Sequence, residues 1–160
     1  MTDKQILRKT LLEKRKAHHL THGKSGGAAL LAQFQAQPVL PDGEWRVGVY
    51  MPAGSEVDPK PLMQYLQDQG HRLCLPFCLR SDQPASFRAY QMGDALGPDG
   101  LGIEAPLSDV ACVPDIVFLP LLGVDRLGNR LGRGGGTYDR TLAALRAAGP
   151  IRAIGLAYDA

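Results

Sequence analysis

The stretch of the chain best suited to bind a ligand mixes arginine with glycine between residues 115 and 140. Its members are Arg126, Gly128, Arg130, Gly132, Arg133, Gly134, Gly135, Gly136 and Arg140. Glycine lets backbone N–H groups approach a ligand closely, and guanidinium groups supply fixed positive charge and paired donors. Because such a loop in front of a helix N-terminus binds anions, we expect a phosphate site here.

The loop matches neither of two widespread phosphate motifs. No Gly-Lys-Ser/Thr sequence closes it, as a Walker A loop requires. Counted from Gly132, the third glycine of a dinucleotide fingerprint falls on Thr137. The structural alternative is a plain turn with solvated arginines. The interleaved arginines, together with an apolar strand before the loop and a helix after it, favour phosphate binding.

The segment Arg130-Leu-Gly-Arg-Gly-Gly-Gly-Thr-Tyr-Asp-Arg140 closely resembles the signature of the 5-formyltetrahydrofolate cyclo-ligase family, also called methenyltetrahydrofolate synthetase. Weaker matches follow in the family's order over nearly the whole chain: Lys4 and Arg8, then residues 49–58, 72–76, 102–106 and 154–159. The resemblance implies ATP-dependent conversion of 5-formyltetrahydrofolate to 5,10-methenyltetrahydrofolate with release of ADP and phosphate. The implied partners are therefore ATP and a reduced folate.

The resemblance also assigns roles to individual residues. Guanidinium forks match phosphate oxygens two at a time, which favours Arg130 and Arg133 as the catalytic phosphate clamp. The implied ATP-binding residues are Lys4, Arg8, Arg130, Leu131, Gly132, Arg133, Gly134, Gly135, Gly136, Thr137 and Tyr138. Met51, Glu56 and Tyr138 would contact the folate, and Asp139 would bind Mg²⁺.

Several of these residues have structural alternatives when taken alone. Lys4 and Arg8 also suit a solvated basic helix face. Met51 fits a buried strand position. Asp139 fits the first turn of a helix, where the dipole favours an acid.

The chain departs from the family at two points. Thr137 stands where the family usually carries an aromatic residue, and the chain stops at Ala160, before a further strand and metal-binding carboxylate. We therefore expect a C-terminally short domain over residues 1–160, an exposed sheet edge near residues 151–158 and weaker magnesium binding. The alternative function is a catalytically impaired nucleotide- or folate-binding protein of the same fold. With either function we expect a monomer or weak dimer.

Composition excludes several other classes of protein. With 160 residues and 44% hydrophobic side chains, the chain suits one domain with a real core. It has no apolar run long enough for a membrane span and no secretory signal at its start. Cys74, Cys78 and Cys112 lack zinc spacing, so we expect buried free thiols and a cytoplasmic location.

Charge is unevenly distributed along the chain. The net charge is +2, yet residues 1–24 contain seven Lys or Arg against two acids. A basic helix could bind RNA, but the small net charge and sparse aromatics favour no nucleic-acid partner and no membrane partner. A sugar-phosphate isomerase or coenzyme A transferase is a weaker alternative based on fold analogy.

Periodicity and turn residues predict the elements that position the loop. We expect helices over residues 3–20, 28–36, 59–69 and 138–148, and strands over 45–51, 72–75, 86–91, 115–119 and 151–158. Residues 21–27 and 92–114 are predicted to be loops, and His18, His19, His22 and His71 to be exposed. The alternation predicts a single-domain α/β fold, a three-layer, open, largely parallel sheet with helices on both faces. Ligands bind such sheets at the carboxyl ends of the strands, where the arginine–glycine loop begins.

Overall fold

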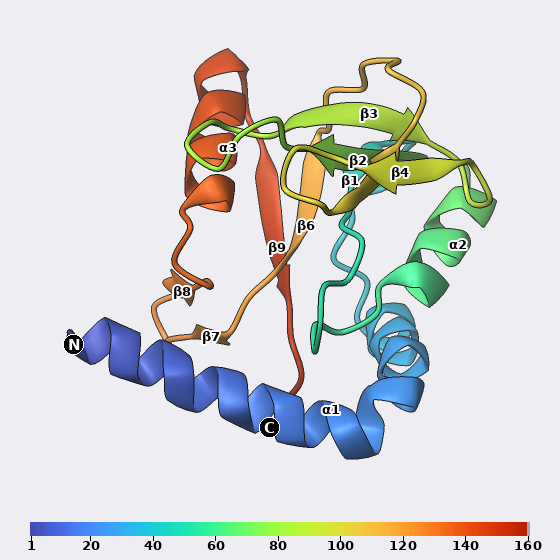
Figure 1. Ribbon diagram of the computed structural model, residues 1–160. Helices are drawn as coiled ribbons and strands as arrows, with labels where there is room; N and C mark the ends of the chain where they lie inside the picture. The colour runs from blue at the N-terminus through green and yellow to red at the C-terminus, as the bar shows by residue number, and fades with distance from the viewer. Residues whose placement is uncertain (160) are drawn as a thin grey trace.

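The computed structural model describes residues 1–159. The helices are α1 (Asp3–Ala36), α2 (Lys60–Asp68) and α3 (Thr137–Ala148). The strands are β1 (Arg46–Gly48), β2 (Arg72–Phe77), β3 (Ser86–Tyr90), β4 (Leu96–Pro98), β5 (Glu104–Pro106), β6 (Ile116–Pro120), β7 (Gly123–Val124), β8 (Arg130–Leu131) and β9 (Arg152–Leu156). Figure 1 shows how these elements are arranged.

The central sheet has five strands in the order β3-β2-β1-β6-β9. Strands β2, β1, β6 and β9 are parallel to one another, and β3 runs antiparallel to β2 at one end. This arrangement confirms the predicted open, largely parallel sheet. Within the described residues, strand β9 lies at the other end of the strand order.

Alternate residues of each strand pack on opposite faces of the sheet, as the twofold period of a strand requires. On one face Val47, Leu73 and Phe118 pack with apolar residues of α1 and α2. On the other face Val117 packs with Leu142 of α3. The sheet is therefore the middle of three layers, with α1 and α2 on one side and α3 on the other (Figure 1), as predicted.

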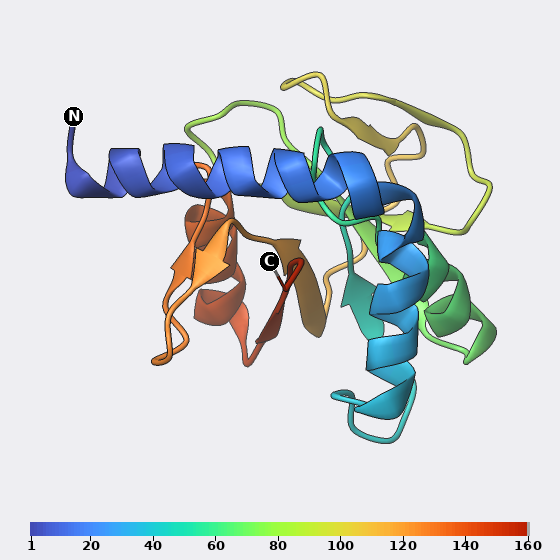
Figure 2. The same cartoon turned by 90° about the horizontal axis from the view of Figure 1, so that it is seen from below.

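Helix α1 is continuous through residues 21–27, so the predicted break there is wrong. Its axis turns in the middle (Figure 2), in a segment that contains Ser25, Gly26 and Gly27. A Cβ on Gly26 would lie 2.8 Å from the Tyr158 ring, and one on Gly27 would lie 2.8 Å from the Asp58 carbonyl oxygen. These glycines allow close packing inside a helix, and that packing outweighs their low helix propensity.

Other local predictions need smaller corrections. Residues 92–114, predicted to be loops, contain the antiparallel pair β4–β5. The arginine–glycine loop contains a second antiparallel pair, β7–β8. Helix α2 begins at Lys60, one residue later than predicted, and Asp58 Oδ1 accepts from the Lys60 N–H at 3.0 Å.

Two of the three cysteines are paired, which corrects the expectation of free thiols. Cys74 and Cys112 form a disulfide, with their Cα atoms 5.9 Å apart, while Cys78 is free and buried. A bridge between Arg88 and Ala111 brings the segment before β6 alongside β3 and so places Cys112 next to β2. The pairing depends on this tertiary contact between segments 38 residues apart, which sequence spacing does not reveal.

Three of the four histidines are also less exposed than predicted. The rings of His18 and His19 are half-buried beside Tyr158, whose hydroxyl lies 3.0 Å from His19 Nδ1. His71 is half-buried, and its Nδ1 accepts from the Trp45 N–H at 3.2 Å. Only His22 of the predicted set is exposed. Within residues 1–159 no helix has both the length and the apolar character of a membrane span.

Candidate active site

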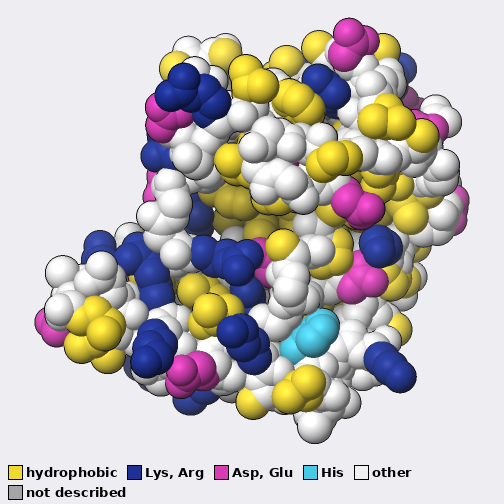
Figure 3. Space-filling view, in the orientation of Figure 1, with side chains coloured by type: hydrophobic (Ala, Val, Ile, Leu, Met, Phe, Trp, Pro, Cys, Tyr) yellow, Lys and Arg dark blue, Asp and Glu magenta, His cyan; other side chains and the backbone are white. Residues whose placement is uncertain are grey.

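A cavity of roughly 330 Å³ opens at the carboxyl ends of three neighbouring parallel strands. Its wall includes Tyr50 after β1, Pro76 at the end of β2 and Pro120 at the end of β6. Figure 3 shows the hollow, with hydrophobic side chains inside it and Lys and Arg side chains gathered along its lower rim. Open α/β sheets bind their ligands at this position, so the cavity is the first candidate for a site.

The arginine–glycine loop forms one wall of the cavity. Residues 130–139, from β8 to the first turn of α3, all line it. Gly134 and Gly136 have φ values of +105° and +71°, in the region that glycine adopts without strain. Gly136 is the N-cap of α3 and gives the helix no side-chain cap. The first N–H groups of α3 are therefore available for an anion in the cavity.

Helix α1 reaches this loop from the far end of the sequence. The Arg8 Nε atom donates to the Gly132 carbonyl oxygen at 3.0 Å, and Lys4, one turn earlier, also lines the cavity. The two segments are 124 residues apart in sequence. All the residues predicted to bind ATP thus surround one cavity, although the structure does not test their roles.

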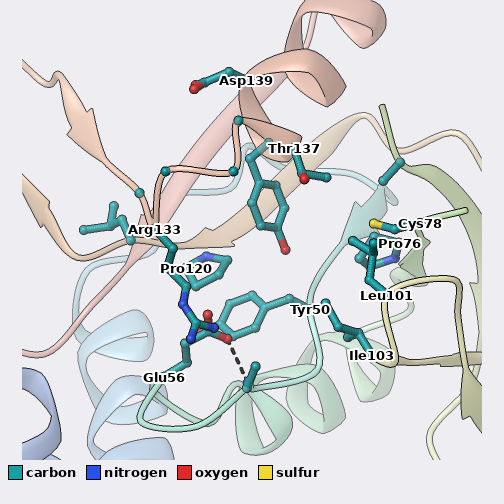
Figure 4. A pocket seen from close by; sticks show the side chains of 18 of the residues that line it. Tyr50, Glu56, Pro76, Cys78, Leu101, Ile103, Pro120, Arg133, Thr137 and Asp139 are labelled. Carbon is teal, nitrogen blue, oxygen red and sulfur yellow. Dashed lines mark hydrogen bonds between the residues drawn. The ribbon is translucent and has the colours of Figure 1, made fainter. Parts of the chain in front are cut away.

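The candidate metal ligand, Asp139, lies at the margin of the site. Its carboxylate accepts from Arg130 Nη2 and forms a salt bridge with it, and its side chain is 78% exposed. Figure 4 shows Asp139 pointing away from the centre of the cavity. Within residues 1–159 no group of three His, Cys, Asp or Glu side chains could hold a metal ion. The described residues therefore do not fit a metal site built from protein ligands alone.

Glu56 is a buried carboxylate that lines the cavity within electrostatic reach of Arg133 of the arginine–glycine loop. It is only 6% exposed, and its Oε2 atom accepts from the Ala53 N–H at 2.9 Å, the dashed contact in Figure 4. Burial raises the pKa of Glu56, against the opposing effects of the Ala53 N–H, Arg15 and Arg133. The predicted folate residues Met51 and Tyr138 line the same cavity.

Arg15 lines the cavity but is absent from the site residues predicted from the sequence. Its side chain is 7% exposed and lines the cavity, and its Nε atom donates to Ser55 Oγ at 3.0 Å. Lys4, Arg8 and Arg15 follow one another at i, i+4 and i+11, which puts them on neighbouring faces of α1 and is the sequence pattern that could have indicated Arg15. The loop that contains Ser55 packs against α1 and determines that Arg15 is buried. The spacing of residues along a helix cannot predict which loop will pack there.

The apolar wall of the cavity was missed as well. Leu101 and Ile103 line it from the turn between β4 and β5, and each is 38% exposed. Figure 4 shows both side chains facing the cavity across from Glu56. Apolar residues within a glycine- and proline-rich stretch were a signal that this stretch does more than connect strands.

The fold and the cavity define a three-layer α/β protein in which an arginine–glycine loop and a buried carboxylate line the same cavity. The chain belongs to the 5-formyltetrahydrofolate cyclo-ligase family, whose sequence model matches residues 1–160.

Named relatives have similar sequences over part of their length. The chain is 33% identical to a 5-formyltetrahydrofolate cyclo-ligase of Mycolicibacterium smegmatis over 118 residues, which is 68% of this chain and 60% of the relative. It is 36% identical to the enzyme of the same name from Escherichia coli K12 over 106 residues, covering 60% of this chain and 56% of the relative. The matched part is thus about three fifths of each relative.

Two solved structures share the fold. The 5,10-methenyltetrahydrofolate synthetase of Aquifex aeolicus superposes with a TM-score of 0.77 at 26% identity, over 98% of this chain and 78% of the other. A 5,10-methenyltetrahydrofolate synthetase from Mycoplasma pneumoniae superposes with a TM-score of 0.66 at 24% identity, over 99% and 92%. The second likeness concerns the fold alone.

Proposed function

We propose that this protein converts 5-formyltetrahydrofolate to 5,10-methenyltetrahydrofolate with consumption of ATP. The observation that carries the proposal is the single cavity in which Arg8, Arg133 and residues 130–137 meet Glu56. A cationic loop suits a triphosphate, and a buried carboxylate suits the N–H groups of a pterin. Family membership supports the same activity.

The proposed reaction solves the problem that a formamide oxygen is a poor leaving group. The γ-phosphoryl group of ATP is transferred to the formyl oxygen, and ADP leaves. Nitrogen N10 then attacks the activated formyl carbon, the C–O bond breaks, inorganic phosphate departs, and the N10 proton is lost. The product is the cyclic methenyl cation. Such phosphoryl transfer needs positioning and charge neutralisation more than covalent help from the protein.

In this proposal the arginine–glycine loop neutralises the charge that moves during phosphoryl transfer. Arg133 and Arg130 are the phosphate clamp, and the N–H groups of residues 132–136 complete the cradle. One donor of this kind in a water-poor site contributes about 3 kcal/mol to the transition state. Arg130 has to exchange Asp139 for a phosphate oxygen, because the two side chains are paired in the free protein.

Glu56 binds the pterin ring in this proposal. Its carboxylate accepts from the ring N–H and amino groups, while the apolar wall with Leu101 and Ile103 covers the rest of the folate. Met51 and Tyr138 complete the folate side of the cavity.

We propose that magnesium enters as the complex with ATP rather than as a resident ion. Magnesium in phosphate-transfer sites is usually held by one or two carboxylates together with substrate phosphates. Asp139 is the carboxylate on the loop side of the cavity, and it is available only after Arg130 releases it. The metal supplies charge neutralisation for the triphosphate when bound.

A turnover assay tests the proposal. Purified protein is mixed with 5-formyltetrahydrofolate, ATP and Mg²⁺, and the ultraviolet absorbance of the methenyl product is followed. We expect absorbance to grow only when all components are present, together with equimolar ADP. Binding of both ligands by calorimetry without product would instead support the non-catalytic binding protein. Absence of binding would reject both.

The location and assembly of the protein stay predictions from the sequence: cytoplasmic, and a monomer or weak dimer. We also keep as a proposal that residues 1–160 form one cyclo-ligase-like domain. Two apolar clusters on the two faces of one sheet support it.

A further inference from the structure

Arg15 is a largely buried cation whose terminal nitrogen atoms make no hydrogen bond to the described residues 1–159. Its side chain is 7% exposed and lines the cavity. Within residues 1–159 its one hydrogen bond runs from Nε to Ser55 Oγ, at 3.0 Å. A guanidinium group has five N–H donors and stays charged in proteins. The two terminal NH₂ groups make no hydrogen bond to residues 1–159 and are not fully buried, so their donors are free for a ligand in the cavity.

A buried charge with unused donors is costly unless something compensates it. Part of the compensation is the Glu56 carboxylate, whose charge favours the ionised form of Arg15. Burial acts in the opposite direction and is the larger effect on the pKa of Arg15, which is lowered. A ligand atom that accepts hydrogen bonds would supply the acceptor that the terminal NH₂ groups of Arg15 lack within residues 1–159.

The position of Arg15 identifies which end of the cavity it serves. It is seven residues beyond Arg8, so it lies about 10 Å farther along the helix axis. Arg8 contacts the arginine–glycine loop at Gly132, whereas Arg15 contacts the loop that carries Ser55 and Glu56. Arg15 therefore lies beside the loop that carries the carboxylate, within electrostatic reach of both Glu56 and Arg133.

A carboxylate beside a guanidinium group matches one edge of a pterin. On that edge the pyrimidinone ring presents N3–H and the 2-amino group as donors, with the 4-oxo oxygen as an adjacent acceptor. Glu56 can accept from the donors, and the neighbouring guanidinium can donate to the oxygen. We propose that Arg15 is a specificity-determining residue that donates from its terminal NH₂ groups to the 4-oxo oxygen of the folate, an inference that rests on the proposed function.

The test compares 5-formyltetrahydrofolate with its 4-amino-4-deoxy analogue, in which an amino group replaces the 4-oxo oxygen and N3 no longer carries a hydrogen. The loss of the N3–H contact affects every variant alike, so the effect of Arg15 is read from the change that each substitution causes for each ligand. Calorimetry gives the affinity of each for the wild type, Arg15→Met and the matched control Lys14→Met, in which the neighbouring exposed cation is removed. A hydrogen bond to a charged group corresponds to about 10- to 100-fold in affinity. We expect Arg15→Met to bind the 4-oxo ligand about 10- to 100-fold more weakly than the wild type. Its affinity for the 4-amino analogue should fall by less than about 3-fold, and its affinity for ATP should not change. Lys14→Met should match the wild type.

Each alternative outcome overturns the inference in a distinct way. If Arg15→Met lost the same affinity for both folates, the role of Arg15 would be to hold the loop through Ser55 and not to recognise the 4-oxo oxygen. A loss confined to ATP would place Arg15 on the phosphate. A wild type that does not bind 5-formyltetrahydrofolate would reject the proposed function itself.

A conservative variant keeps the test informative if Arg15→Met does not fold, which circular dichroism and thermal unfolding would reveal. Arg15→Lys retains the charge and one donor group but loses the planar fork. Its affinity for the 4-oxo ligand should lie below the wild type, with the 4-amino analogue again little changed. An Arg15→Lys protein that loses both ligands equally would overturn the inference.

Discussion

The cavity holds positive charge from two distant segments around one buried carboxylate. Arg133 comes from the loop before α3, Arg15 from α1, and both act on the pKa of Glu56. In spite of these two cations, burial keeps that pKa above its usual value. The carboxylate is thus held where folding does not favour its charge, which is typical of a residue kept for binding or catalysis.

Replacement of Arg133 tests the proposed phosphate clamp. We expect Arg133→Ala to lower kcat by about 100-fold or more, because a transition-state donor is lost while the fold remains. The matched control is Arg126→Ala, since Arg126 is an exposed arginine of the same loop that does not line the cavity. Steady-state kinetics gives kcat for both variants, and Arg126→Ala should keep the kcat of the wild type. An Arg133→Ala protein with near-normal turnover would reject the clamp.

Glu56→Gln should separate stability from function. Because the pKa of Glu56 is raised in the folded protein, the folded state binds more protons, and stability falls as pH rises above 4.5 through the folded pKa. The Glu56→Gln variant has no charge at this position, so its stability does not fall with pH for this reason. We expect Glu56→Gln to unfold at a higher temperature than the wild type near pH 8, with the difference disappearing at pH 4, and to bind 5-formyltetrahydrofolate more weakly. Calorimetry across this pH range measures both unfolding temperatures. A Glu56→Gln protein that unfolds at a lower temperature than the wild type near pH 8 would contradict the interpretation.

Among the elements, α1 links the two halves of the cavity. Its N-terminus is fixed by a capping box, in which Thr2 Oγ1 accepts from the Gln5 N–H and Gln5 Oε1 accepts from the Thr2 N–H. Its first half supplies Arg8 and Arg15 to the site, and its second half packs on α2 through the glycine segment. The turn in the helix axis (Figure 2) allows one helix to do both.

Two glycines in α1 provide a matched test of this packing. A Cβ on Gly27 would lie 2.8 Å from a backbone oxygen, that of Asp58, whereas one on Gly23 would lie 2.7 Å from the movable His19 ring. Alanine gains about 1 kcal/mol in helix propensity at either position. We expect Gly27→Ala to destabilise the protein by about 1–3 kcal/mol, and Gly23→Ala to be neutral or stabilising. Urea unfolding of both variants measures the difference, and a stabilised Gly27→Ala protein would contradict it.

For the molecule as a whole, the covalent tie between Cys74 and Cys112 joins β2 to the segment before β6. That segment follows the β4–β5 turn, whose Leu101 and Ile103 form the apolar wall of the cavity. The disulfide therefore limits how far this wall can move away from the sheet.

Reduction of the disulfide should lower stability. The bond closes a loop between residues 38 apart, which corresponds to about 2–4 kcal/mol of stabilisation. We expect dithiothreitol to lower the melting temperature of the wild type but not of Cys112→Ser, which should melt like the reduced wild type. Cys78→Ser, in which the free thiol is removed, should keep the full response to reductant. A wild type insensitive to reductant would contradict the pairing.

The family resemblance was needed to select Lys4 and Arg8. Local sequence patterns alone were enough to predict the largely parallel sheet and the loop at residues 130–136. These features follow from residue periods and from backbone chemistry that neighbouring residues determine. The burial of Arg15, the Cys74–Cys112 bond and the apolar wall at Leu101 and Ile103 were decided only by the tertiary structure. Each of them depends on segments distant in sequence that meet at one place, and a linear pattern does not specify that meeting.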